Sequence, residues 1–140
     1  MPEKSYRILE HTADIGIKAY GADLKQAYVN AAKGLFSLIT DMRKIKAVTF
    51  RDIDVNAADA DILLVTWLNE LIYLFDTENI LFRQFQISEL QKTRLKARAY
   101  GEKVDSRRHA IKIGVKSTTY HMLRIEQTDN GYLARVIFDI

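Results

Sequence analysis

The sequence contains no cysteine. It therefore forms no disulfide, offers no zinc–thiolate site and has no thiol nucleophile. Its longest apolar run is too short to cross a bilayer, and residues 2–5 carry no hydrophobic signal region. These absences predict a cytoplasmic protein with no membrane partner.

The sequence motifs of nucleotide-binding and nucleophilic enzymes are also missing. There is no G-x-x-x-x-G-K-[ST], no G-x-G-x-x-G and no G-x-S-x-G, and the six glycines are scattered singly. A group-transfer enzyme that acts alone is therefore disfavoured. The enzyme class that remains is a metal-assisted hydrolase built on His11, Asp14 and Asp139.

The net charge of +3 is mild, and the basic residues gather in the second half of the chain. Two interpretations stay open: a footprint for the phosphates of RNA or an acidic protein face, and a solvated basic face on an edge strand. No Arg-rich or aromatic nucleic-acid motif is present, and DNA is not expected as a partner. The residues are Arg94, Lys96, Arg98, Lys103, Arg107, Arg108, Lys112 and Lys116.

The apolar content of 48% over 140 residues suits a single domain with one core, spanning residues 1–140. The residue patterns predict an α+β fold, with a mixed or antiparallel sheet packed with two main helices. The predicted strands are 7–9, 15–20, 46–55, 80–87 and 93–100; the predicted helices are 24–40, capped by Asp23, and 62–75, capped by Asp59 or Asp61. Between the last of these strands and the final hairpin, residues 106–119 are expected to form a loop with a short strand or helical turn at 111–116.

The last 20 residues predict a β-hairpin with Asn130-Gly131 in a type I′ turn. In that register Glu126 faces Arg135, Met122 faces Asp139, and His121 faces Ile140. The apolar face then holds Leu123, Ile125, Val136 and Phe138. Asp139 lies on the opposite face of the hairpin.

The helix predicted at 62–75 is apolar around most of its circumference, so we expect it to be central. A narrow polar stripe is left, formed by Thr66, Asn69, Glu70 and Tyr73. Solvent exposure of this stripe is favoured over a partner-binding role.

Asp14 and Asp139 each stand in an apolar, strand-like run, where a buried charge is costly without a partner. A terminal carboxylate at Ile140 follows Asp139 directly. If the fold joins these segments, three carboxylates converge and require a cation or a basic partner. Hard oxygen donors favour Ca²⁺, Mg²⁺ or Mn²⁺, and His11 would extend the site toward Zn²⁺ or Mn²⁺. Alternatively, Asp14 caps a turn and Asp139 is a frayed terminal residue.

A second group of polar residues consists of Glu102, Asp105, His109 and His121. Acid–base pairs and metal ligands have this composition, but so do ordinary polar loops. The structural interpretation is favoured, with His121 as a neutral, hydrogen-bonded core histidine.

Six segments of the chain together resemble the archease family. They are EHTADIGIKAYG (Glu10–Gly21), AAKGLFSLITD (Ala31–Asp41), WLNELIYLFDTE (Trp67–Glu78), the GE-x-x-D-x-x-x-H element (Gly101–His109), VKSTTYHML (Val115–Leu123) and VIFDI (Val136–Ile140). They follow the family order from one end of the chain to the other. The departures are small: Lys103 stands where proline is usual, and Ser117 where alanine is common.

The resemblance implies a compact α+β domain that is a protein activator and not an enzyme. Archeases assist the GTP-dependent tRNA-splicing RNA ligase: they promote guanylylation of the ligase, restore its multiple turnover and broaden its nucleotide use. The resemblance also implies a divalent cation, most simply Ca²⁺, held by Asp14, Asp139 and Ile140. The implied partner is the ligase, with tRNA contacted only through it. His11, Glu70 and the basic face are candidate docking residues. The alternatives are a metal-dependent phosphohydrolase and an RNA-binding or chaperone-like module.

Overall fold

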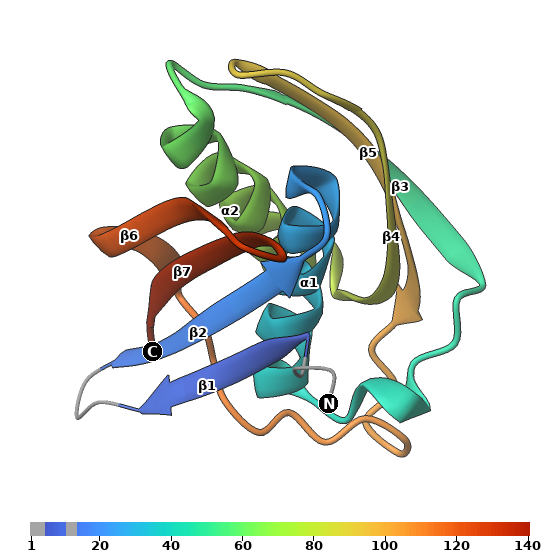
Figure 1. Cartoon of the computed structure of the whole chain (residues 1–140). Helices are drawn as coiled ribbons and strands as arrows, with labels where there is room; N and C mark the ends of the chain where they lie inside the picture. The colour runs from blue at the N-terminus through green and yellow to red at the C-terminus, as the bar shows by residue number, and fades with distance from the viewer. Residues whose placement is uncertain (1–4, 11–13) are drawn as a thin grey trace.

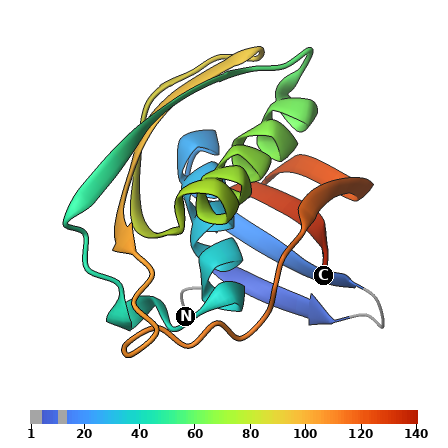
Figure 2. The same ribbon diagram turned by 180° about the vertical axis from the view of Figure 1, so that it is seen from behind.

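The structure is a computed structural model that describes residues 5–10 and 14–140, apart from the side chain of Glu10. Two helices lie between two antiparallel sheets, as both ribbon views show (Figures 1 and 2). The strands are β1 (Tyr6–Glu10), β2 (Asp14–Gly21), β3 (Thr49–Asn56), β4 (Ile80–Leu90), β5 (Arg94–Lys103), β6 (Ser117–Thr128) and β7 (Gly131–Asp139); the helices are α1 (Leu24–Ile39), the short 3₁₀ helix η1 (Met42–Lys44) and α2 (Ala60–Glu78). The predicted α+β fold with two main helices and a C-terminal hairpin is confirmed.

The strands from the two ends of the chain form one sheet, and the strands from its middle form the other. The four-stranded sheet has the order β1-β2-β7-β6, so the second and last strands of the chain lie side by side in its centre. The three-stranded sheet has the order β3-β5-β4. Every described strand pair is antiparallel. Because β2 pairs with β7, two segments far apart in the sequence contribute to one surface.

Helix α1 begins and ends where the sequence pattern predicts. Asp23 is its N-cap, and Asp23 Oδ1 accepts a hydrogen bond of 2.8 Å from the backbone N–H of Gln26. The helix ends at Ile39, and the next residue, Thr40, is extended. One face of α1 packs on the four-stranded sheet, and Phe36 reaches Phe82 and Phe85 of β4 on the other side.

Helix α2 is as central as its apolar circumference predicts. Asp59, one of the two candidate caps, accepts from the backbone N–H of Ile62 at 2.9 Å. The helix continues to Glu78, three residues beyond the predicted end, because Asn79 ends it in the left-handed conformation with φ 59°. Trp67 is fully buried, and its indole N–H donates to the carbonyl oxygen of Tyr28 at 3.1 Å.

The connection between β5 and β6 contains no strand or helix over residues 111–116, so the short element predicted there is wrong. Figure 2 shows this segment, in orange, running from the three-stranded sheet beneath the helices to β6. Two hydrogen bonds of 2.7 Å hold it to the end of α1: Lys112 N–H donates to Ile39 O, and Thr40 Oγ1 donates to Ala110 O. These main-chain partners replace the hydrogen bonds that a regular element would supply.

The final hairpin forms, but its predicted register is wrong. Thr128 pairs with Gly131, so the turn residues are Asp129 and Asn130. Among the described non-glycine residues only Asn79 and Met122 have positive φ, which excludes the type I′ turn. Arg135 therefore faces Arg124 instead of Glu126, and Glu126 faces Leu133.

A bulge in β6 changes the register a second time, between Thr119 and Arg124. Because of it, Asp139 faces Ser117 instead of Met122, and Ile140 does not face His121. The predicted apolar face survives: Val136 and Phe138 are buried, and Leu123 and Ile125 pack against the core.

Neither helix of the described part of the chain is both long and apolar enough to cross a lipid bilayer.

Candidate functional site

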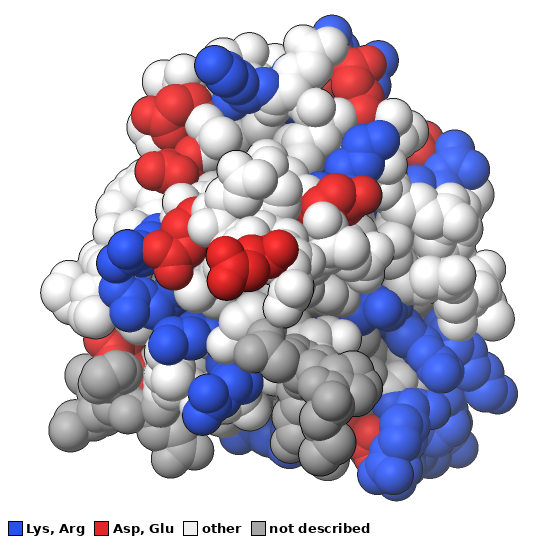
Figure 3. All heavy atoms as spheres, viewed as in Figure 1, with Lys and Arg blue, Asp and Glu red and all other residues white. Residues whose placement is uncertain are grey.

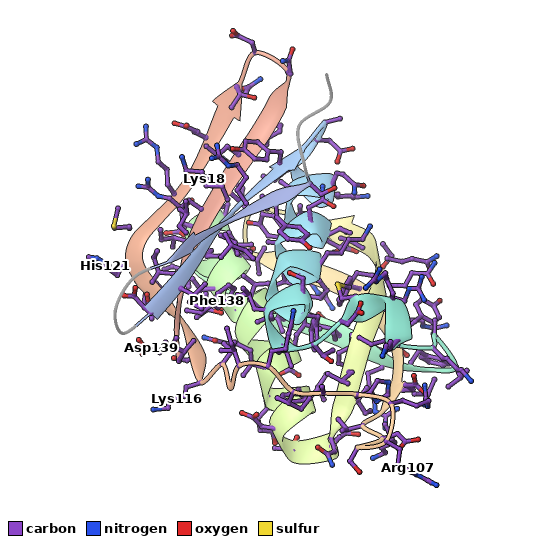
Figure 4. All side chains as sticks on the ribbon, turned by 90° about the horizontal axis from the view of Figure 1, so that it is seen from below. Lys18, Arg107, Lys116, His121, Phe138 and Asp139 are labelled. Atoms are coloured by element: carbon purple, nitrogen blue, oxygen red, sulfur yellow. The ribbon has the colours of Figure 1, made fainter. Side chains whose placement is uncertain are left out.

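The pairing of β2 with β7 places Asp14 directly opposite Asp139. Directly opposed residues of an antiparallel pair have Cβ atoms about 4.5–5.5 Å apart on the same face. That face points away from the helices, because the neighbouring residues Ile15 and Phe138 are buried in the core. Figure 4 shows Asp139 on the outer side of the strands and Phe138 toward α1. Two distant carboxylates thus meet at one end of the sheet.

Asp14 has a carboxylate oxygen without a partner in the described part of the structure. Its Oδ1 is buried and accepts no hydrogen bond, although the residue as a whole is half-buried. A desolvated carboxylate oxygen beside a second carboxylate is unfavourable unless a positive group neutralises it. None of the described ion pairs includes Asp14 or Asp139.

The chain around Asp139 is fixed on both sides. The Asp139 carbonyl oxygen accepts a 2.8 Å hydrogen bond from Lys116 N–H, and Ser117 is the cross-strand neighbour of Asp139 on β6. The side chain of Ile140 is half-buried and packs against the core. These contacts contradict the alternative that Asp139 is a frayed residue.

The donors at this end of the sheet suit a hard cation in kind, but their number is small. Within the described residues, no group of three His, Cys, Asp or Glu side chains is arranged to hold a metal ion. Asp14 and Asp139 supply two carboxylates, and the Ile140 carboxylate would be the third oxygen donor. His11, the fourth candidate, lies outside the described residues, as do Thr12 and Ala13 of the predicted bend.

Asn69 of α2 holds the start of β6 in place. Asn69 Oδ1 accepts from Thr118 N–H at 2.7 Å, and Asn69 Nδ2 donates to Thr118 O at 3.5 Å. The polar stripe of α2 is therefore solvent-exposed at Tyr73, whereas Asn69 makes a structural contact. Glu70 is half-buried, and burial raises the pKa of its carboxyl group above the ordinary value. The sequence analysis missed the role of Asn69, since nothing local indicates its partner.

Glu102, Asp105 and His109 form a closed structural network. Glu102 is 7% exposed and accepts from Arg108 Nη2 at 2.6 Å and from Lys46 N–H at 2.6 Å. His109 Nδ1 accepts from Asp105 N–H at 2.9 Å, which leaves Nε2–H to donate toward Glu102 Oε2 at 3.1 Å and Lys44 O at 3.0 Å. The favoured structural interpretation of these three residues is confirmed.

His121 does not belong to that network, and its predicted place in the core is wrong. It is exposed in the β6 bulge, where its N–H donates to Thr119 Oγ1 at 3.2 Å. The bulge inserts extra residues opposite Val136, so the alternation that placed His121 inward no longer applies.

Two of the basic residues of β5 are neutralised by their neighbours on β3. Arg98 pairs with Asp52 at 2.8 Å and Arg94 with Asp54 at 2.9 Å. Strand β5 is also the centre of its sheet, so the expected edge strand is wrong. These ion pairs weaken the interpretation of this face as a phosphate footprint.

Comparisons with known proteins agree with this fold and with the resemblance in sequence. The model of the Archease protein family (MTH1598/TM1083) matches residues 6–140. The chain belongs to the archease family. Archeases of Methanosarcina mazei and Saccharolobus islandicus are 38% and 41% identical to it, and each alignment covers 98% of this chain and 97% or 99% of the relative.

Solved structures of the family have the same fold. The solution structure of Methanobacterium thermoautotrophicum protein 1598 matches with a TM-score of 0.84 at 34% identity, over 97% of this chain and 99% of that one. A crystal structure of an archease from Thermotoga maritima, described as a possible chaperone, matches with a TM-score of 0.65 at 19% identity, over 100% of this chain and 98% of that one. The second likeness concerns the fold alone.

Proposed function

We propose that this archease activates a GTP-dependent RNA ligase of tRNA splicing, promoting guanylylation of the ligase and its multiple turnover and broadening its nucleotide use. The observation that carries the proposal is the cross-strand pair Asp14–Asp139, with one buried carboxylate oxygen that lacks a partner among the described residues. Membership of the archease family supplies the class of partner.

The residues that would hold a divalent cation, most simply Ca²⁺, are Asp14, Asp139 and the terminal carboxylate of Ile140. When bound, the cation supplies positive charge that attracts phosphate oxygens. Ca²⁺ takes about six to eight oxygen ligands, so three donors leave positions open for oxygens of a partner. A short ligand set at an outward-facing edge suits docking beside the active site of another protein.

The side chains of this chain orient that edge and leave the covalent chemistry to the ligase. Ile140 packs its side chain on the core, and Asn69 holds β6 beside Asp139 through Thr118. Such preorganised charge lowers the cost of arranging a partner's nucleotide and metal. If this chain binds one conformation of the ligase more tightly than the others, docking shifts the ligase toward that conformation.

The test is the rate of ligase guanylylation with Asp14→Asn or Asp139→Asn protein. We expect either substitution to reduce stimulation about tenfold or more, since each replaces a charged oxygen ligand with a neutral amide of nearly the same shape. Asp129→Asn is the matched control, because Asp129 is an exposed carboxylate in the turn of the same hairpin.

Thermal unfolding with and without Ca²⁺ gives a readout that is independent of activity. Ca²⁺ should raise the melting temperature of the wild type and of Asp129→Asn, but not of the two site variants. Full stimulation by both site variants would rule out a role for the Asp14–Asp139 pair. Turnover of a phosphorylated substrate by the protein alone would instead indicate a hydrolase.

A further inference from the structure

A row of four basic residues crosses the outer face of the four-stranded sheet, one from each strand. Arg7 of β1 is opposite Lys18 of β2, Lys18 is opposite Arg135 of β7, and Arg135 is opposite Arg124 of β6. In Figure 3, basic surface runs diagonally across the left half of the molecule, over the strands in this order. We call these four residues the basic row.

The fold itself does not require the basic row, since like charges directly opposite each other destabilise a sheet. Arg124 is neutralised by Glu126 at 2.8 Å. Within the described part of the chain, Arg7, Lys18 and Arg135 form no ion pair. The three-stranded sheet shows the ordinary solution, because Arg94 and Arg98 there each pair with an aspartate on the next strand. Three open cations in line indicate an external anion.

The β6 bulge adds an exposed aromatic residue beside the basic row. Its residues Tyr120 and Met122 are 62% and 47% exposed, and Met122 has a φ of 53° that non-glycine residues rarely adopt. Arg135 supports the bulge through a 3.2 Å hydrogen bond from its Nε to Met122 O. The backbone of the bulge therefore adjoins Arg135 of the basic row.

The outer face of the four-stranded sheet also contains the Asp14–Asp139 pair. Lys18 lies four residues after Asp14 on β2, and Arg135 lies four residues before Asp139 on β7. At about 3.4 Å per residue, the basic row and the Asp14–Asp139 pair are about 13–14 Å apart along the strands. Figure 4 shows Lys18, His121 and Asp139 on the side of the strands that faces away from α1.

We propose that this outer face binds single-stranded RNA, with phosphates on Arg7, Lys18 and Arg135 and a base stacked on Tyr120. A line of cations suits the evenly repeated charge of a nucleic-acid backbone, and an exposed aromatic ring beside it provides a stacking platform. An acidic protein face would use the same cations, and it is an outcome of the test below. The choice of RNA rests on the proposed function.

The experiment measures binding of a fluorescently labelled ten-residue uridine oligonucleotide to the purified protein alone, by anisotropy over a series of salt concentrations. The variant is Arg7→Gln/Lys18→Gln. The control is Lys25→Gln/Lys92→Gln, which removes the same charge from two exposed lysines near the start of α1 and the β4–β5 turn. We expect about tenfold weaker binding for the variant alone, and a salt slope lower by about 1.4, or about 0.7 for each lost phosphate contact.

A second pair of variants tests the stacking residue. Tyr120→Ala should weaken binding about fivefold or more. Tyr73→Ala removes an equally exposed tyrosine from α2, where it is 59% exposed, and should leave binding unchanged. Melting temperatures report folding, and that of the basic-row variant should not fall, because the substitution relieves repulsion.

Equal binding by the wild type and the basic-row variant would overturn the proposal. So would a loss of binding confined to Lys44→Gln/Lys112→Gln, two exposed lysines outside this face.

Guanylylation of the ligase without RNA is measured in parallel. If only guanylylation suffers in the basic-row variant, the row contacts an acidic protein face: the RNA proposal fails and the proposed function stands. If the wild type does not stimulate guanylylation while the basic-row variant loses RNA, the proposed function fails and the RNA surface stands.

Discussion

At the scale of single residues, Glu102 shows how a group typical of an active site serves the fold instead. Arg108 holds the pKa of Glu102 down at about 2, with backbone N–H of Lys46 and the His109 ring contributing less. Burial alone would raise that pKa, so the hydrogen bonds outweigh desolvation. These donors come from Lys46, two residues after η1, and from the segment after β5, so one carboxylate ties the two segments together.

The Glu102 network makes the protein sensitive to acid, and the sign follows from the lowered pKa. The unfolded chain binds the proton near pH 4.5 and the folded chain near pH 2, so this contribution to stability is present above about pH 4.5 and is lost between there and pH 2. Glu102→Gln should lower stability at neutral pH and flatten its fall with acid. Urea titrations at several pH values measure both effects.

Asp41→Asn is a sharp control for the acid prediction. Arg43 likewise lowers the pKa of Asp41 to about 2. That pair is exposed and only two residues apart, so it also forms in the unfolded chain and contributes little to stability. An equal flattening of the pH profile by both substitutions would contradict the special role of Glu102.

At the scale of elements, β6 is held by α2 as well as by its neighbouring strand. It is an edge strand, and its bulge interrupts the pairing with β7. Asn69 supplies main-chain hydrogen bonds to Thr118 from the helix side. The amide side chain of Asn69 therefore helps to position Ser117, the cross-strand neighbour of Asp139.

Asn69→Ala should destabilise the protein by about 1–3 kcal/mol, because it leaves the N–H of Thr118 without a partner. Thr66→Ala is the control on the same stripe. Thr66 Oγ1 donates only within its own helix, to Ile62 O at 2.9 Å, so we expect a change within about 0.5 kcal/mol. The midpoint of urea unfolding measures both. Equal midpoints for the two variants would show that β6 does not rely on Asn69.

At the scale of the whole molecule, the candidate cation site is formed where the sheet pairs β2 with β7, two segments far apart in the sequence. Extending the chain past Ile140 with a tag should weaken Ca²⁺ binding about tenfold or more, since it converts a terminal carboxylate into a neutral amide. An N-terminal tag should leave binding unchanged. Isothermal titration of both tagged proteins tests this, and equal affinity would argue against the terminal carboxylate as a ligand.

The sequence pattern predicted the structural features that depend on residues close together in the chain. Both helix caps and the central place of α2 follow from local spacing, and the structure confirms them. The pairing of Asp14 with Asp139 came from family resemblance, because residues so distant leave no periodic signal of their contact. Once that pair is known, the antiparallel register forces Lys18 opposite Arg135, so half of the basic row was predictable. The β6 bulge was not, since TYHMLRIEQT reads as continuous strand and the contact of Arg135 with Met122 depends on tertiary structure.

The paired charges on the three-stranded sheet also affect how the molecule meets its partners. Arg94 and Arg98 are neutralised by aspartates within hydrogen-bonding distance, so beyond a Debye length of about 8 Å these two cations add little to the potential of this face. The unpaired cations of the other sheet are not cancelled in this way. A diffusing polyanion therefore experiences a torque that turns the four-stranded sheet toward it before any contact forms. The ion pairs of one sheet thereby favour productive collisions at the other.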